Sequence, residues 1–113
     1  MLSCNLSNDE ITGEYVGSFK TNIDTIKLLK NNIYERKIYD NNKNKIFSNL
    51  GKYKIENDRI IFNDFLLNEN DLNVTSTYNS KDLLNASLPI ERTIFGVKIN
   101  SNVDLEYFYT KQE

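Results

Sequence analysis

Apolar and polar residues alternate over short runs along most of this chain, which is the pattern of half-buried β-strands. Between positions 12 and 20, Tyr15 and Phe19 share one parity with Gly13 and Gly17, and the other parity carries Glu14, Ser18 and Lys20. Glycines inside such a run indicate a bend or a close approach of two backbones, as at the corner of a barrel. The pattern therefore predicts a first strand here.

A β-hairpin is predicted next, from residues 24–30 and 33–40 joined by Asn31-Asn32. Arg36 falls between Tyr34 and Ile38 on the apolar parity of the second run. A helix over residues 23–33 competes, because its isoleucines and Leu29 are also spaced by three or four. We favour strands, since the Asn pair would fall inside the helix and since Ile, Thr and Tyr prefer pleated surfaces.

The second half of the chain shows further strand patterns. Residues 45–56 and 59–63 form a second predicted hairpin around Asn57-Asp58, and residues 73–78 have the pattern of an edge strand. Ser80 is a candidate cap for a short helical turn near residues 80–85. Residues 89–100 are expected to form one strand with a bulge at Gly96, because the apolar parity switches there, and residues 103–110 form the last strand.

The fold class predicted from these runs is all-β, a small antiparallel up-and-down β-barrel of about eight strands, with a sandwich as the open alternative. The 113 residues are enough for one core but too few for two independent ones. We expect residues 11–113 to form this single domain, and residues 1–10 to be a flexible tether.

Charge and residue usage narrow the possible functions. The chain has 14 Lys+Arg against 16 Asp+Glu, so it has no positive excess for a phosphate backbone, and we expect no nucleic-acid partner. No apolar run approaches the roughly 18 residues that span a bilayer.

The chain has no histidine and one cysteine, which argues against a zinc or copper site and against Ser-His or Cys-His catalysis. We therefore predict no enzyme, no metal and no cofactor. A carboxylate pair of the glycosidase kind remains as a weaker alternative, although no spacing selects one.

Charged residues within apolar runs are the first candidate site residues. In the Glu91-Arg92 pair, one of the two side chains is expected to point inward. Arg36 also lies on the apolar parity of its predicted strand, so its side chain would point inward too. A buried charge needs a partner. These arginines are therefore either bonded to a carboxylate or to carbonyls at a barrel end, or they line a ligand cavity.

Two aromatic residues are candidates for an exposed docking patch. Tyr39 and Phe108 fall on the outward parity of their strands, whereas most other tyrosines lie on apolar parities. Exposed aromatic patches mark interaction sites. We predict partner binding through Tyr39 and Phe108, together with Glu91, Arg92 and Arg36.

The single cysteine lies close to the start of the chain. Leu2-Ser3-Cys4 is similar to the end of a bacterial lipobox, where small residues precede a cysteine that is lipidated after the signal peptide is removed. On this interpretation the chain begins just before the mature terminus, and Cys4 carries the lipid. The alternative is a free thiol in the disordered terminus of a cytosolic protein, and the natural gene decides between them, because a gene with no upstream signal peptide makes the protein cytoplasmic.

Several segments together resemble a family of small bacterial envelope lipoproteins of uncharacterised function. The matching segments are Gly13-Glu14-Tyr15-Val16, Asp24-Thr25-Ile26-Lys27-Leu28, Asn49-Leu50-Gly51-Lys52-Tyr53 and Leu88-Pro89-Ile90-Glu91-Arg92 with Phe95-Gly96 and the closing aromatic strand. The resemblance implies a lipocalin-like barrel and a periplasmic, lipid-anchored location. No activity comes with it.

The function expected from the sequence is that of a cell-envelope lipoprotein that binds a protein without catalysis, of the immunity or inhibitor type. Its membrane contact would be only through the lipid on Cys4. The alternative is a lipocalin-like carrier of a small apolar ligand.

Overall fold

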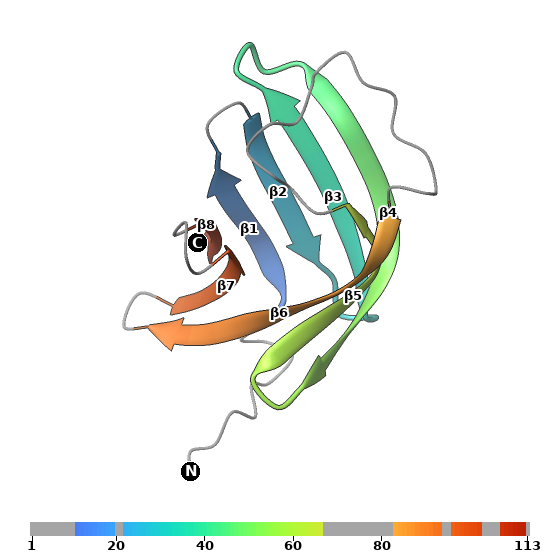
Figure 1. Cartoon of the computed structure of the whole chain (residues 1–113), viewed down its shortest axis with the longest axis vertical. Helices are drawn as coiled ribbons and strands as arrows, with labels where there is room; N and C mark the ends of the chain where they lie inside the picture. Colours follow the sequence, from blue (N-terminus) through green and yellow to red (C-terminus); the bar gives the residue numbers. More distant parts are fainter. Residues whose placement is uncertain (1–10, 20–21, 67–82, 94–95, 103–106, 113) are drawn as a thin grey trace.

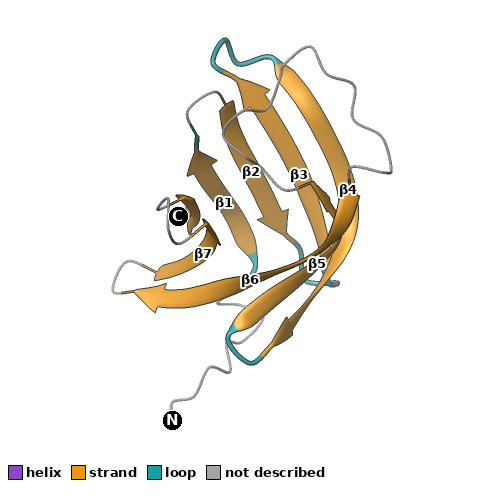
Figure 2. Ribbon diagram, viewed as in Figure 1, coloured by secondary structure: helices purple, strands orange, loops and turns teal. Residues whose placement is uncertain are grey.

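Eight antiparallel strands form a closed barrel in the part of the chain that the computed structural model describes, which is residues 11–19, 22–66, 83–93, 96–102 and 107–112. Each strand pairs with the next along the chain, and the last pairs with the first (Figure 1, Figure 2). The strands are β1 (Gly13–Ser18), β2 (Asn22–Leu28), β3 (Ile33–Asp40), β4 (Lys45–Glu56), β5 (Arg59–Leu66), β6 (Leu83–Thr93), β7 (Gly96–Asn102) and β8 (Tyr107–Lys111).

The barrel closes between β1 and β8. Tyr15 and Val16 of β1 lie opposite Lys111 and Thr110 of β8. The backbone N–H of Gln112 extends this pairing by donating to the carbonyl of Glu14 at 2.7 Å. Closure joins the first and the last strand, which would otherwise be the two edges of the sheet. The predicted up-and-down barrel is thus confirmed, and the sandwich alternative is wrong.

Both predicted hairpins are present. Asn32 and Asn57 adopt φ values of 64° and 56°, which are accessible to asparagine and which allow the tight reversals after β2 and β4. Residues 23–33 lie in β2, the following turn and the start of β3. The competing helix over these residues is therefore absent, and the Asn pair is the turn.

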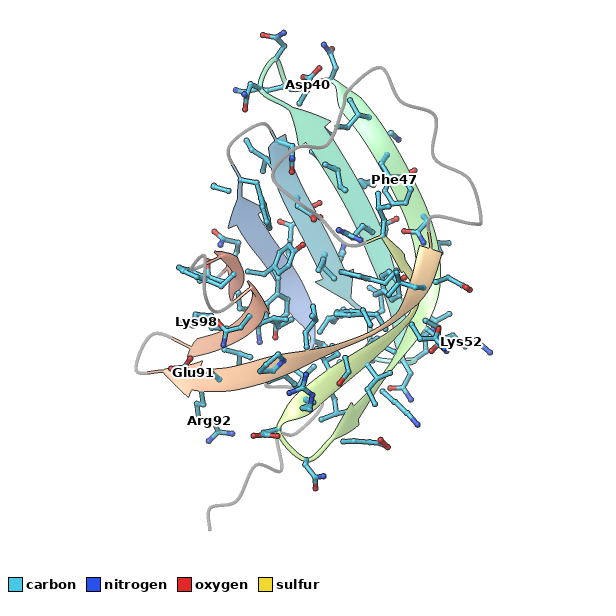
Figure 3. All side chains as sticks on the ribbon, viewed as in Figure 1. Asp40, Phe47, Lys52, Glu91, Arg92 and Lys98 are labelled. Carbon is cyan, nitrogen blue, oxygen red and sulfur yellow. The ribbon has the colours of Figure 1, made fainter. Side chains whose placement is uncertain are left out.

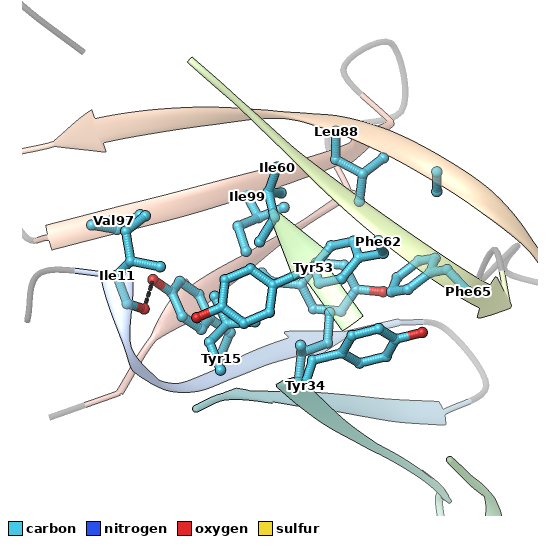
Figure 4. Packing of buried hydrophobic residues seen from close by; sticks show 14 of the residues in the cluster. Ile11, Tyr15, Tyr34, Tyr53, Ile60, Phe62, Phe65, Leu88, Val97 and Ile99 are labelled. Carbon is cyan, nitrogen blue, oxygen red and sulfur yellow. Dashed lines mark hydrogen bonds between the residues drawn. The ribbon is translucent and has the colours of Figure 1, made fainter. Parts of the chain in front are cut away.

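The core fills the barrel interior from the inward parity of the strands. Along β2 and β3 every second residue is buried, and the same alternation continues in β5 and β6. Figure 4 shows aromatic rings and branched aliphatic side chains from opposite strands packed together. The buried cluster consists of Ile11, Tyr15, Phe19, Ile26, Leu28, Tyr34, Tyr53, Ile60, Phe62, Phe65, Ala86, Leu88, Val97, Ile99 and Tyr109.

Three of the buried tyrosines in this core donate to backbone carbonyls. The hydroxyl of Tyr15 donates to the carbonyl of Ile11 at 2.7 Å (Figure 4), and that of Tyr53 donates to Leu29 at 2.8 Å. Tyr34 reaches the carbonyls of Asn63 and Asp64, where β5 bulges and Asp64 takes a φ of 55°. These hydroxyls bind backbone groups that the ladders leave free where a strand begins, ends or bulges.

Two predictions for the second half of the chain were wrong. Residues 89–100 are not one bulged strand: β6 and β7 form an antiparallel hairpin, and Gly96, with φ 127°, opens the second strand. The apolar parity switches because the chain reverses. The helical turn near residues 80–85 is also wrong where it can be compared, since Leu83 and Leu84 lie in β6 opposite Leu66 and Phe65. The predicted edge strand over 73–78 and the cap at Ser80 lie outside the described residues.

Candidate functional site

The barrel interior contains an ion pair to which a tyrosine is hydrogen-bonded. We call these three residues, Asp24, Arg36 and Tyr109, the interior polar cluster. Asp24 shares the inward parity of Ile26 on β2, and Arg36 lies between Tyr34 and Ile38 on β3. All three residues of the cluster have 0% exposure. The structure thus places Arg36 in the core bonded to a carboxylate, which is one of the two alternatives that the sequence left open.

The three side chains are joined by short, charge-assisted hydrogen bonds. Arg36 donates from Nε to Oδ1 of Asp24 at 2.7 Å and from Nη2 to Oδ2 at 2.6 Å, a bidentate arrangement. The hydroxyl of Tyr109 donates to the same Oδ2 at 2.6 Å. One carboxylate therefore accepts three hydrogen bonds from strands β3 and β8, which compensates for its burial.

Gly17 on β1 lets Tyr109 reach Asp24. β1 lies between β8 and β2, and Gly17 is directly opposite Asp24 in the β1–β2 register. A Cβ atom at Gly17 would lie 2.9 Å from the Tyr109 ring and 2.7 Å from the Phe19 ring. The absence of a side chain therefore allows the tyrosine ring to cross β1, which is a close-packing requirement of the kind that glycine in a strand meets.

The electrostatics of the cluster keep Arg36 charged and Tyr109 protonated. Burial alone would lower the pKa of Arg36, but the charge of Asp24, with smaller contributions from Tyr109, outweighs it, and the net shift is upward. Burial, followed by the charge of Asp24, raises the pKa of Tyr109 well above its ordinary value.

Arg36 also packs against aromatic rings. Its guanidinium carbon lies 4.0 Å from the centre of the Phe65 ring. Phe65 in turn stacks on Phe62, with ring centres 4.5 Å apart. Such a contact between a cation and an aromatic face is attractive, and more so when both are removed from water. The interior polar cluster is thereby continuous with the aromatic core.

A second group of candidate site residues lies outside the barrel, and we call it the outer row (Glu91, Lys98 and Phe108). Glu91 on β6 is directly opposite Lys98 on β7, and their Oε1 and Nζ atoms are 3.5 Å apart. The same Nζ lies 4.7 Å from the centre of the Phe108 ring on β8, and Phe108 is 40% exposed. An accessible aromatic ring is thus bordered by a charge pair.

The expectation that either Glu91 or Arg92 points into the core is wrong. Both side chains are exposed, and Figure 3 shows Glu91 beside Lys98 while Arg92 projects away from the barrel. Arg92 has the inward parity of Ala86 and Leu88, but β6 ends at Thr93. At the rim of the barrel an inward-parity side chain can reach solvent, so neither residue enters the core.

The predicted aromatic pair is separated in the structure. Phe108 is on β8, whereas Tyr39 is on β3, and β1 and β2 lie between these strands. Tyr39 is half-buried where the β3–β4 register shifts beside Lys45. Of the predicted site residues, Glu91 and Phe108 belong to the outer row, Arg36 to the interior polar cluster, and Arg92 and Tyr39 to neither. Cys4 lies outside the described residues.

The outer face of β3 and β4 carries a hollow of about 300 Å³ between the two strands. It is lined mainly by charged and polar side chains, and beside them lies Leu50, which is 66% exposed. Within the described ranges, no three acidic or thiol groups come together in a way that could hold a metal ion.

Sequence reasoning missed Asp24 and Lys98, although a signal for each was present. Asp24 shares the parity of Ile26 and Leu28, so opposite charges fall on the inward parity of both strands of one predicted hairpin. Lys98 faces Glu91 only if the chain reverses near residue 95. The interpretation of residues 89–100 as a single strand placed these two residues far apart.

Neither a protein-family model, nor a curated protein, nor a solved structure matches this chain. The likeness to envelope lipoproteins therefore stays a prediction. No helix in the described part of the chain has the length and apolar character needed to cross a membrane.

Proposed function

We propose that this protein is a non-catalytic binding module of the bacterial cell envelope, of the immunity or inhibitor type, and that it docks a protein partner on the outer row. The observation that supports this most is the exposed Phe108 ring bordered by Lys98 and Glu91. Aromatic residues near the centre of an interface, surrounded by polar groups, supply much of the binding energy in protein complexes.

The outer row suits a rigid docking surface. Its three residues come from three neighbouring strands of a closed sheet, so their relative positions are fixed by backbone hydrogen bonds. Lys98 contacts both other residues, which limits its rotation before a partner arrives. Pre-organised side chains lose less entropy on binding.

The interior polar cluster supports the non-catalytic part of the proposal. Asp24 is a buried carboxylate, but Arg36 and Tyr109 already occupy its oxygens. A general acid or base must reach a substrate proton directly or through one water. With no histidine in the chain, the Ser-His and Cys-His routes are also closed.

The location is part of the same proposal. We place the protein in the periplasm, anchored by a lipid on Cys4, with residues 1–10 as the tether to the barrel. The lipid is the only membrane contact that this proposal needs. Mass spectrometry of the protein purified from its native envelope tests it: a diacyl or triacyl mass on the peptide that carries Cys4 supports the proposal, and an unmodified thiol contradicts it.

The alternative is a lipocalin-like carrier of a small apolar ligand, and the closed barrel is the observation that favours it. Against it, a barrel of about eight strands has an interior that side chains can fill on their own. Here the aromatic cluster and the Asp24–Arg36 pair occupy that interior. We therefore prefer the protein-binding function.

Capture from an envelope extract tests the docking proposal. The full chain is immobilised, and proteins retained in stoichiometric amount are identified by mass spectrometry. We expect wild type and the control Leu50→Ala, which alters an exposed leucine on β4, to retain the same partner. Phe108→Ala should weaken retention about 30-fold, since truncation of a central aromatic residue costs about 2 kcal/mol or more. Failure to retain any stoichiometric protein, or equal retention by Phe108→Ala, contradicts the proposal.

A further inference from the structure

The first part of β4 has a neighbouring strand on one side only within the described part of the chain. Residues 45–52 pair with β3, whereas the pairing of β4 with β5 begins at Tyr53, which is opposite Phe62 (Figure 1). Beyond Phe62, the described residues of β5 pair with β6. Although β1 and β8 close the sheet, a short strand edge therefore remains along this part of β4, and such an edge can accept a strand from another chain.

Side-chain hydrogen bonds hold β5 in its separate course. The hydroxyl of Tyr34 donates to the carbonyls of Asn63 and Asp64 at 2.6 and 2.9 Å, and Nδ2 of Asn49 donates to the carbonyl of Asp64 at 3.0 Å. Asp64 has a φ of 55°, at the place where the β5–β6 register shifts. These contacts take the place of a continued β4–β5 ladder, so specific interactions stabilise the separation of the two strands.

The β3–β4 register determines which backbone groups face the edge. The N–H of Tyr53 donates to the carbonyl of Asn32 at 3.0 Å. Bonded and non-bonded positions alternate along an antiparallel ladder. The backbone of Asn49 is therefore bonded to β3, whereas the N–H and C=O groups of Ser48 and Leu50 point away from β3. No described strand pairs with these two residues on that side.

Lysine side chains border the edge on the outer face of the barrel. Lys37 on β3 is directly opposite Ser48, and Lys45 is the first residue of β4. All three line the hollow of about 300 Å³ described above. Glu35 also lines the hollow, but it lies directly opposite Lys27 on β2, which offsets its charge. The surface beside the edge is therefore positively charged.

This charge distinguishes between possible occupants of the edge. A second copy of the chain would bring the lysines beside one edge close to those beside the other, and lysine on an edge strand commonly protects against such pairing. A segment that carries carboxylates would instead place opposite charges side by side, which stabilises neighbouring strands. Charge complementarity thus favours an acidic segment over a second copy.

We propose that the edge of β4 at Ser48 and Leu50 binds an extended acidic segment of a partner protein. The segment adds a strand to the sheet by exchanging backbone hydrogen bonds with these two residues. A carboxylate opposite the small Ser48 side chain extends into the hollow towards Lys37 and Lys45. In this mode of recognition the main chain supplies affinity and the side chains supply specificity. The edge lies on β4 and the outer row on β6 to β8, so this proposal does not rest on the docking function proposed above.

Two blocked peptides that differ only in charge test the proposal, Thr-Glu-Thr-Glu-Thr and Thr-Lys-Thr-Lys-Thr. Each is titrated to millimolar concentration into the ¹⁵N-labelled full chain, and amide shifts and amide hydrogen exchange are followed by NMR. Without peptide, the Ser48 and Leu50 amides should exchange quickly and the Asn49 amide slowly. The glutamate peptide should shift the Ser48 and Leu50 signals saturably and slow their exchange, and the lysine peptide should bind at least tenfold more weakly.

Four results would overturn the proposal. The first two are the absence of saturable shifts and an equal affinity for the two peptides. Slow exchange of the Ser48 and Leu50 amides in dilute protein without peptide would show that the chain covers its own edge. Exchange that slows as the protein alone is concentrated would show that a second copy pairs there instead.

Variants separate binding at the edge from binding elsewhere. Ser48→Pro removes an N–H group from the edge and none from the β3 ladder, and proline is accepted on edge strands. It should weaken binding of the glutamate peptide at least tenfold, and equal binding by the folded variant would contradict the proposal.

A charge reversal gives a second test that does not depend on the folding of Ser48→Pro. Lys37→Glu combined with Lys45→Glu should reverse the preference between the two peptides. The control Lys54→Glu changes a charge on β4 where β5 already pairs, opposite Ile61, and should keep the wild-type preference. A folded double variant that still prefers the glutamate peptide overturns the proposal.

Discussion

At the scale of single residues, the interior of this barrel depends on a glycine and a salt bridge that act together. Gly17 makes room for the Tyr109 ring, and Tyr109 then donates to the carboxylate that holds Arg36. Together, these residues allow β2, β3 and β8 each to place a polar side chain in the apolar core, where the three side chains satisfy one another's hydrogen bonds.

Gly17→Ala is expected to destabilise the fold by about 1–3 kcal/mol, because the new Cβ atom would lie within 3 Å of two aromatic rings and overpacked cores carry costs of this size. Urea unfolding measures the loss. The cost should be smaller in a Tyr109→Leu background, where one of the rings is gone. Ser18→Ala, at an exposed position on the same strand, is the control. A loss equal to that of the control would show that the rings do not crowd Gly17.

The Asp24–Arg36 pair predicts a characteristic double-mutant result. Asp24→Leu or Arg36→Met alone should cost about 3–5 kcal/mol, since each leaves one buried charge without its partner. The double variant should cost less than either single one, because no charge is left buried. Chemical unfolding of all four proteins checks this, and additive losses would mean that the two charges do not depend on each other.

At the scale of elements, the β6–β7 hairpin determines the outer row. It brings Glu91 opposite Lys98, and the pairing of β7 with β8 then puts Lys98 within reach of Phe108. Gly96 opens β7 with a φ of 127°, a conformation that residues with a side chain rarely adopt, and a Cβ atom there would meet nothing within 4 Å. The requirement for glycine here is one of backbone conformation alone.

Gly96→Ala should therefore cost about 1–3 kcal/mol through backbone strain. No second substitution nearby should relieve this cost, since no neighbouring atom causes it, in contrast to Gly17→Ala. Thermal unfolding with and without the change gives the value. A neutral Gly96→Ala would mean that the hairpin turns with a different backbone conformation.

The sequence predicted elements well wherever alternation was bounded by a turn signal. Asn31-Asn32 and Asn57-Asp58 identified both N-terminal hairpins, because asparagine accepts the positive φ that a tight reversal needs. It failed at Gly96, where a parity switch is compatible with either a bulge or a reversal. It failed at Leu83 and Leu84 because a capping serine suggested a helix, whereas pairing with β5 decided the outcome.

The candidate site was only partly predictable for a related reason. Arg36 was identified, since a charge on an apolar parity is visible along one strand. Its partners Asp24 and Tyr109 come from β2 and β8, and their convergence depends on the closure of the barrel. Parity shows which way a side chain points but not which distant strand it meets.

At the scale of the whole molecule, stability should fall in alkaline solution. Burial is the main cause of the raised pKa values of Tyr15, Tyr34, Tyr53 and Tyr109. The unfolded chain releases these phenol protons near the ordinary pKa of about 10, whereas the folded chain retains them. The folded state thus binds more protons above that pH, so its stability is complete below about pH 10 and declines as the pH rises further.

Urea unfolding between about pH 8 and 11.5, a range that brackets the ordinary tyrosine pKa, measures this decline. Tyr109→Phe removes one of the four titrating groups and should flatten the decline, while lowering stability at neutral pH by about 1–3 kcal/mol through the lost hydrogen bond to Asp24. A stability that is constant or rising across this range would contradict the assignment of these tyrosines to the core.

The interior polar cluster depends on a sheet that closes on itself, because closure brings β8 to β1 and carries Tyr109 to Asp24. NMR of the labelled chain tests closure directly through backbone NOEs between β1 and β8. We predict NOEs that link Tyr15 to Lys111 and Val16 to Thr110, alongside those of the seven sequential strand pairs. If the sequential pairs are present and the β1–β8 NOEs are absent, the sheet is open and the account is contradicted.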